Sequence, residues 1–166
     1  MEFFQEKAIL TAIAIEIRSL SFYRSMSSKV DDIHTRRFFE LLAVEEADQL
    51  NLFCKQYSGN DGKLVDILVK NNMYSYPYYC SMLNSVGCHT SESDALQIAL
   101  KEEQACIDCY TEFMEEIQEQ TIREIFESIL KEARKHCELI SEEYMRLMGS
   151  AEHLDYDYSC INDLRA

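Results

Sequence analysis

The sequence predicts an all-α protein, a four-helix bundle made of two similar helical hairpins. The chain has 166 residues but only four glycines and one proline, which suits long helices and argues against a turn-rich β-sandwich or barrel. Apolar residues recur at helical spacing along four separate stretches. The second half of the chain also repeats the first at a constant offset of 87 residues, the separation of Glu16 from Glu103, without a gap.

Identical residues related by this offset include acids and aromatic residues. The pairs are Ala12 and Ala99, Glu16 and Glu103, Tyr23 and Tyr110, Phe39 and Phe126, Glu40 and Glu127, and Glu45 and Glu132. One copy of such a repeat cannot bury its apolar face alone, so the copies pack on each other. Two hairpins that face each other form a four-helix bundle.

The composition limits both the domain count and the partners. With 47% apolar and 28% charged residues, the chain is an ordinary globular mixture that suits one domain. Asp and Glu outnumber Lys and Arg by 30 to 16, and a net charge of -14 would repel a phosphate backbone. We therefore expect no nucleic acid among its partners, although an acidic surface suits Fe²⁺ or a basic protein.

The sequence also indicates where the protein resides. No apolar run approaches the roughly 20 residues that cross a bilayer, and the first residues lack the basic and apolar segments of a signal peptide. The seven cysteines form an odd set, as expected for free thiols in a reducing compartment. We expect a cytoplasmic protein that makes no contact with membranes.

The first hairpin is predicted over residues 3–57. Its first helix covers 3–28, and the inner face carries Ile9, Ile13, Glu16, Ile17, Leu20 and Tyr23. A short turn over 29–32 follows, in which Asp31 or Asp32 is the N-cap. The second helix covers about 33–57, with Phe39, Leu42, Glu46, Gln49, Leu50 and Phe53 inward, and it ends before the glycine-containing stretch 58–62.

A long crossover over 58–91 is expected to return along the bundle and join the hairpins in an up-down-down-up order. It contains Pro77, a short helix near 64–70, and tyrosines within 74–79 that we expect to cover the core and not to form a ligand cage.

The second hairpin is predicted over 92–148. Ser91 and Asp94 offer a capping box for a helix that extends to about 118. Its inner face carries Leu96, Ala99, Leu100, Glu103, Ile107 and Tyr110. The last helix covers about 121–148, with Ile122, Phe126, Ile129, Ala133, His136, Cys137, Ile140 and Tyr144 inward. The bundle thus spans 1–148, and an acidic tail over 149–166 is a terminal segment or a partner-docking stretch.

Acids on the inner faces indicate a metal site. Glu16 and Glu103 lie among apolar residues in equivalent places of the two repeats. A buried carboxylate costs several kcal/mol unless it is protonated, paired or bound to a metal. Glu46 and His136 add a third carboxylate and an imidazole from the second and fourth helices.

This pattern resembles the ferritin-like di-iron carboxylate proteins and, within them, the rubrerythrin family. That family has one Glu on the first and third helices and Glu-x-x-His on the second and fourth. The segments 12–16 and 99–103, each followed by a tyrosine, resemble the first pair of helices. The segments 39–49 and 126–136 match the framework of the second pair, and the resemblance covers about residues 3–148.

The resemblance implies that Glu16, Glu46, Glu103 and His136 bind one or two iron ions or another divalent metal. The chain departs from the family pattern twice, since Gln49 replaces a His and Ala133 replaces a Glu. Fewer ligands imply weaker binding or a single ion. Gln49 and Glu132 are weaker candidate ligands.

The same resemblance implies that the protein reduces peroxide or oxygen. Tyr23 and Tyr110 would then be hydrogen-bonding partners of the ligands or residues that pack in the core. Family members often carry a small iron domain with two Cys-x-x-Cys knuckles. Here the one Cys-x-x-Cys, Cys106 to Cys109, lies within a predicted helix, so electrons are expected to come from a separate protein. The resemblance also implies a homodimer.

Two further hypotheses stay open at this point. The bundle is a scaffold or partner-binding module whose metal site has decayed, as the changes at Gln49 and Ala133 favour. Alternatively, it sequesters iron without turnover. Whether the protein is an enzyme therefore depends on the geometry of the site.

Overall fold

The computed structural model describes residues 2–57 and 90–149, and these form four helices. They are α1 (Glu2–Ser27), α2 (Ile33–Gln56), α5 (Glu92–Glu116) and α6 (Gln120–Met148). Each helix begins and ends within two residues of its predicted bounds, and no strand occurs in this part of the chain. The predicted fold class, an all-α bundle of two hairpins, is confirmed.

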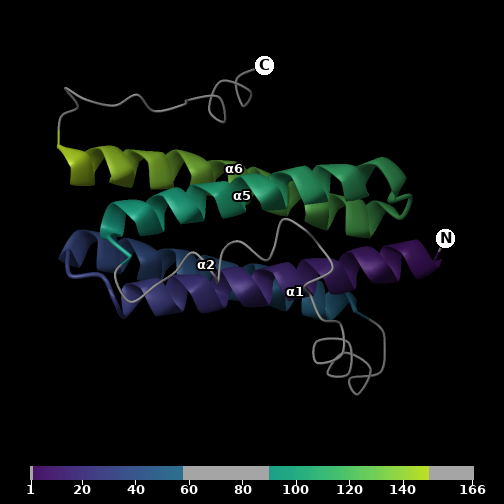
Figure 1. Cartoon of the computed structure of the whole chain (residues 1–166). Helices are drawn as coiled ribbons and strands as arrows, with labels where there is room; N and C mark the ends of the chain where they lie inside the picture. Colours follow the sequence, from purple (N-terminus) through teal and green to yellow (C-terminus); the bar gives the residue numbers. More distant parts are fainter. Residues whose placement is uncertain (1, 58–89, 150–166) are drawn as a thin grey trace.

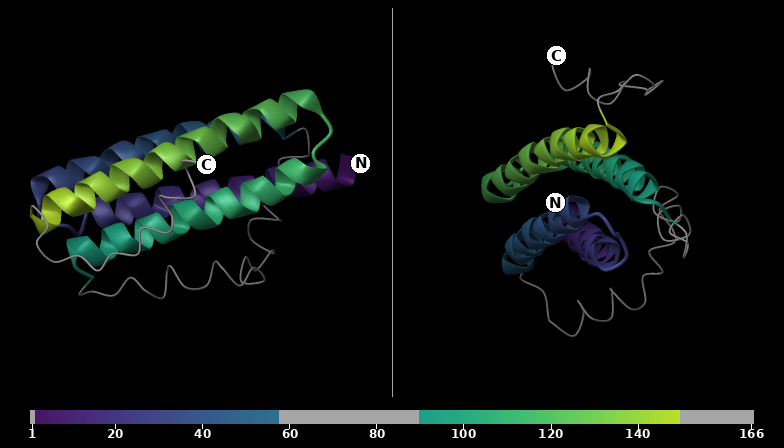
Figure 2. Two further views of the ribbon diagram at one scale, coloured as in Figure 1. Left: turned by 90° about the horizontal axis from the view of Figure 1, so that it is seen from above. Right: turned by 90° about the vertical axis from the view of Figure 1, so that its left-hand side faces the viewer.

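The hairpins form two layers, with α1 and α2 in one and α5 and α6 in the other (Figure 1). The end-on view shows the layer of α5 and α6 facing the layer of α1 and α2 (Figure 2). Helix α1 meets α5, and α2 meets α6. Helices α2 and α5 run in one direction, and α1 and α6 run in the other (Figure 1). The predicted crossover and tail lie, apart from their ends, outside the described residues.

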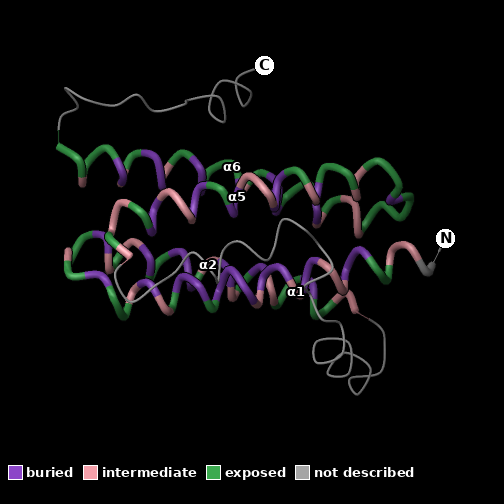
Figure 3. The backbone as a smooth tube through the Cα atoms, viewed as in Figure 1, coloured by how far each residue is buried: buried purple, intermediate pink, exposed green. Residues whose placement is uncertain are grey.

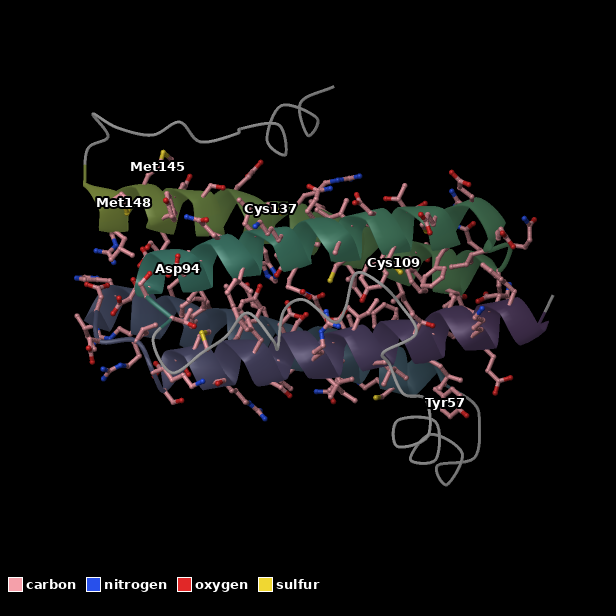
Figure 4. All side chains as sticks on the ribbon, viewed as in Figure 1. Tyr57, Asp94, Cys109, Cys137, Met145 and Met148 are labelled. Atoms are coloured by element: carbon pink, nitrogen blue, oxygen red, sulfur yellow. The ribbon has the colours of Figure 1, made fainter. Side chains whose placement is uncertain are left out.

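Local capping signals set the helix ends. Of the two predicted candidates, Asp32 is the N-cap of α2, and its carboxylate accepts a hydrogen bond from the backbone N–H of Thr35 at 2.8 Å. Ser91 and Asp94 form the predicted capping box at the start of α5, where Figure 4 labels Asp94. Gly149 ends α6 with a φ of 77°, a conformation that glycine adopts without strain.

The inner faces of the helices form one core (Figure 3). Of the residues predicted to point inward, Ile17, Leu50 and Ile122 are only partly buried, and the others are buried. The repeat is visible in the packing: Tyr23 stacks on Phe39 at 6.0 Å between ring centroids, and Tyr110 meets Phe126 edge-to-face at 5.5 Å. These aromatic pairs pack on either side of the buried acids.

Other predictions on the described residues concern thiols and membranes. Cys54 and Cys106 are free cysteines, and Cys106 is buried within α5. His34 is exposed, whereas His89 and His153 lie outside the described residues. None of the four helices is long and apolar enough to cross a bilayer.

Candidate metal centre

Three predicted ligands from three helices meet in the core. They are Glu46 on α2, Glu103 on α5 and His136 on α6, and each offers one ligand atom within 4.8 Å of the others. All three are buried, with exposed fractions of 3%, 4% and 0%. Each helix turns its residue inward because that residue shares a stripe with apolar neighbours. We refer to Glu46, Glu103 and His136 as the triad.

His136 uses both of its ring nitrogens. Nδ1 lies 3.2 Å from Oε1 of Glu103 and 3.4 Å from Oε1 of Glu46, inside the triad. Nε2 lies 2.9 Å from Oε2 of Glu45, whose side chain is 29% exposed at the edge of the bundle. The contact of Glu45 with Nε2 orients the ring so that Nδ1 faces Glu46 and Glu103. Metal-binding histidines commonly show this arrangement.

Glu16 lies next to the triad but outside it. The hydroxyl of Tyr110 donates a hydrogen bond to Oε1 of Glu16, and the carboxyl group of Glu16 interacts electrostatically with that of Glu46. Tyr23 donates in the same way to Oε1 of Glu103, at 2.5 Å. Each hairpin therefore supplies a tyrosine that holds a glutamate of the other hairpin. Both tyrosine rings pack in the core, and both hydroxyls bond to buried carboxylates.

The local electrostatics follow from the burial of Glu16, Glu46 and Glu103 near one imidazole. Burial raises the pKa of Glu16 well above its usual range, and the neighbouring Glu46 raises it further. Burial also raises the pKa of Glu46, against the hydrogen bond from His136. Burial lowers the pKa of His136, but the hydrogen bonds to Glu103 and Glu46 outweigh it and raise the value to about 11. The raised pKa favours the protonated, cationic form of His136 beside these acids.

The two weaker candidate ligands, Gln49 and Glu132, and the residue Ala133 differ in burial and in the atoms that they offer to a metal. Gln49 is buried on α2, one turn after Glu46. Glu132 does not turn inward: its side chain is 42% exposed and lies 3.6 Å from Nζ of Lys135. Ala133 is buried at 3% exposure and offers no donor atom.

Sequence reasoning assigned no site role to Glu45, although it contacts His136. Periodicity places Glu45 near the edge of its helix, because it lies about 100° around the helix from Glu46. Two signals in the sequence pointed to Glu45: it is adjacent to the candidate ligand Glu46, and a glutamate, Glu132, occupies the equivalent position of the second repeat. The contact itself depends on how far α6 approaches α2.

A buried ion pair close to the triad was also missed. Nη2 of Arg18 on α1 lies 2.5 Å from Oε2 of Glu102 on α5, and the two side chains are 8% and 7% exposed. Glu102 directly precedes the candidate ligand Glu103 in the sequence. The pair therefore crosses the interface between the hairpins beside the candidate metal centre.

The donor set of the triad fits a metal ion. Carboxylate oxygens and an imidazole nitrogen suit divalent first-row metals such as iron. Three protein ligands leave coordination positions open, as catalytic metal sites require. A divalent ion would also compensate the buried carboxylates, which are otherwise costly to bury as charges.

Comparison with known proteins agrees with this geometry. The model of the rubrerythrin family matches residues 7–144, which include all four helices almost in full. The searches of curated proteins and of solved structures found no match.

Proposed function

Because the chain belongs to the rubrerythrin family, we propose that it is an iron-dependent oxidoreductase that reduces peroxide or oxygen with electrons from an external donor protein. The convergence of Glu46, Glu103 and His136 within 4.8 Å carries this proposal. The ligand atoms of three side chains that are far apart in the sequence lie close together in the core. Unpaired acids are unfavourable there, and a bound metal would compensate them.

The bound metal supplies a redox couple and open coordination positions. In this proposal Glu46 and Glu103 hold the metal and neutralise its charge, and Nδ1 of His136 completes the set. Tyr23 orients Glu103, and Glu45 orients His136. For hydrogen peroxide, the oxygen–oxygen bond breaks, two electrons come from the donor and two protons from solvent, and two water molecules leave.

Anaerobic titration with Fe²⁺, followed by peroxide and a reduced donor, tests the function. We expect tight Fe²⁺ binding and peroxide-dependent oxidation of the donor by the wild type. In Glu103→Gln, which keeps the side-chain volume and an acceptor for Tyr23, both should be lost. Wild-type protein that binds no Fe²⁺, or binds it without consuming either peroxide or oxygen, would overturn the enzymatic proposal.

A second candidate function is a scaffold or partner-binding bundle. The residues at Gln49 and Ala133 favour it, because each removes a ligand of the family pattern. The same titration separates the two candidates, since a scaffold needs no metal. Retention of iron without peroxide turnover would instead support sequestration.

A homodimer remains a prediction from the family. Light scattering of the purified protein tests it, and a mass equal to one chain of 19.4 kDa would contradict it.

A further inference from the structure

The ligands of the candidate centre are distributed unequally between the two repeats. Glu16 and Glu103 are mates at the repeat offset, and both are buried carboxylates held by a tyrosine of the other hairpin. The next mates differ: Glu46 corresponds to Ala133, and Gln49 corresponds to His136. If the repeat formed two symmetric metal positions, one would therefore retain its ligands and the other would lack some of them. We call these positions the complete half and the depleted half.

The complete half is the triad. Glu103 and His136 come from the second hairpin, and Glu46 reaches them from α2 of the first hairpin. Glu45 and Tyr23 each contact one triad member, and these contacts orient His136 and Glu103.

The depleted half consists of Glu16 and Gln49. A neutral amide replaces the imidazole of the family pattern, and the methyl group of Ala133 replaces its carboxylate. Glu16 accepts a hydrogen bond from Tyr110 and lies outside the group of converging ligand atoms.

The charge balance also favours a single ion. Glu46 and Glu103 neutralise one divalent cation. Two divalent cations carry four positive charges, whereas the buried Glu16, Glu46 and Glu103 supply at most three negative charges. Glu45 is the next acid, but its side chain is 29% exposed at the edge of the bundle, and buried uncompensated charge is strongly unfavourable.

We infer that this chain binds one divalent metal ion, held by Glu46, Glu103 and His136, and that it does not form the di-iron centre of its family. The inference rests on the proposed metal binding. It assigns Glu16 a structural role, in contrast to the ligand role predicted from the sequence.

The matched variants Glu16→Gln and Glu103→Gln test the inference with Mn²⁺ as the probe. Both change one buried, tyrosine-bonded acid at equivalent repeat positions, and circular dichroism checks that both fold. We expect the wild type to bind one Mn²⁺ per chain, with the electron paramagnetic resonance spectrum of an isolated ion. Glu103→Gln should weaken Mn²⁺ binding by about 100-fold or more, which exceeds the usual effect of losing a residue that only orients a ligand. Glu16→Gln should change the affinity by less than about tenfold.

The other outcomes separate this inference from the proposed function. Two Mn²⁺ ions per chain with an exchange-coupled spectrum would overturn the inference and leave the proposed function standing. Equal losses in the two variants would likewise overturn it, because Glu16 would then be a ligand. A wild type that binds neither Mn²⁺ nor Fe²⁺ would overturn the proposed function itself.

Discussion

Tyr23 on α1 donates a hydrogen bond to Oε1 of Glu103 on α5 at 2.5 Å. This contact joins the two hairpins and orients a candidate ligand at the same time. Its repeat mate, from Tyr110 to Glu16, joins the hairpins in the same way but holds an acid outside the triad. Fold stability and metal affinity are therefore separable by comparing the two tyrosines.

We expect Tyr23→Phe to weaken metal binding by about 10–100-fold, the usual range for loss of a partner that orients a ligand. Tyr110→Phe should leave the affinity nearly unchanged, because Glu16 is not in the triad. Isothermal titration with Mn²⁺ measures both, and thermal unfolding shows whether the ring packing survives. A larger effect of Tyr110→Phe would contradict the assignment of Glu103 as the ligand of the pair.

Glu45 and Glu132 form a second matched pair. Both lie within 4.0 Å of Nζ of Lys135, but only Glu45 contacts His136. We expect Glu45→Ala to weaken metal binding by about 10–100-fold, because the imidazole loses the acid that orients it. Glu132→Ala removes an equivalent surface charge and serves as the control, so equal effects would show that charge alone matters.

The buried pair of Arg18 and Glu102 should be sensitive to the loss of one partner. Arg18→Met leaves a carboxylate without its cation in the core, and breaking such a pair costs about 3–5 kcal/mol. The double variant Arg18→Met/Glu102→Leu should recover most of that free energy of unfolding, because neither position then carries a buried charge. Urea denaturation measures both, and a double variant as unstable as the single one would contradict this explanation.

Asp32 links stability to pH. Hydrogen bonds from Thr35 and the ion pair with Arg146 lower the pKa of Asp32 from 3.8 to about 2. Because its folded pKa lies below its unfolded pKa, Asp32 stabilises the fold above about pH 4. That contribution is lost as the pH falls toward 2.

Urea denaturation of wild type and Asp32→Ala across this pH range measures the contribution. The variant should be less stable at neutral pH, and the difference should shrink as the pH falls. A difference that stays constant down to pH 2 would show that Asp32 acts through packing and not through its charge.

Restoring the family pattern should restore the second metal position. We expect Gln49→His/Ala133→Glu to bind about two ions per chain, since imidazole and carboxylate are the donors that first-row metals prefer. Metal analysis after gel filtration counts the ions. Since Ala133 is closely packed, circular dichroism must show a folded variant, and a folded protein that still binds one ion would mean that other residues limit the site.

The sequence by itself determined the elements of this protein. Low glycine and proline content, helical periodicity and the capping residues Asp32, Ser91 and Asp94 are local signals, and local signals suffice to place helix ends. The repeat added the pairing of hairpins. Inward stripes also identified Glu46, Glu103 and His136 as buried, because an apolar stripe orients every residue within it.

Only the tertiary structure decided which atoms meet. Periodicity assigns a residue to a face of its own helix, but a contact between two helices depends on their separation, rotation and axial shift. For that reason the edge residue Glu45 reaches His136 91 positions away, Tyr23 reaches Glu103, and Arg18 pairs with Glu102. The same packing places Glu16 outside the triad, although its helix carries it inward just as the helix of Glu103 does.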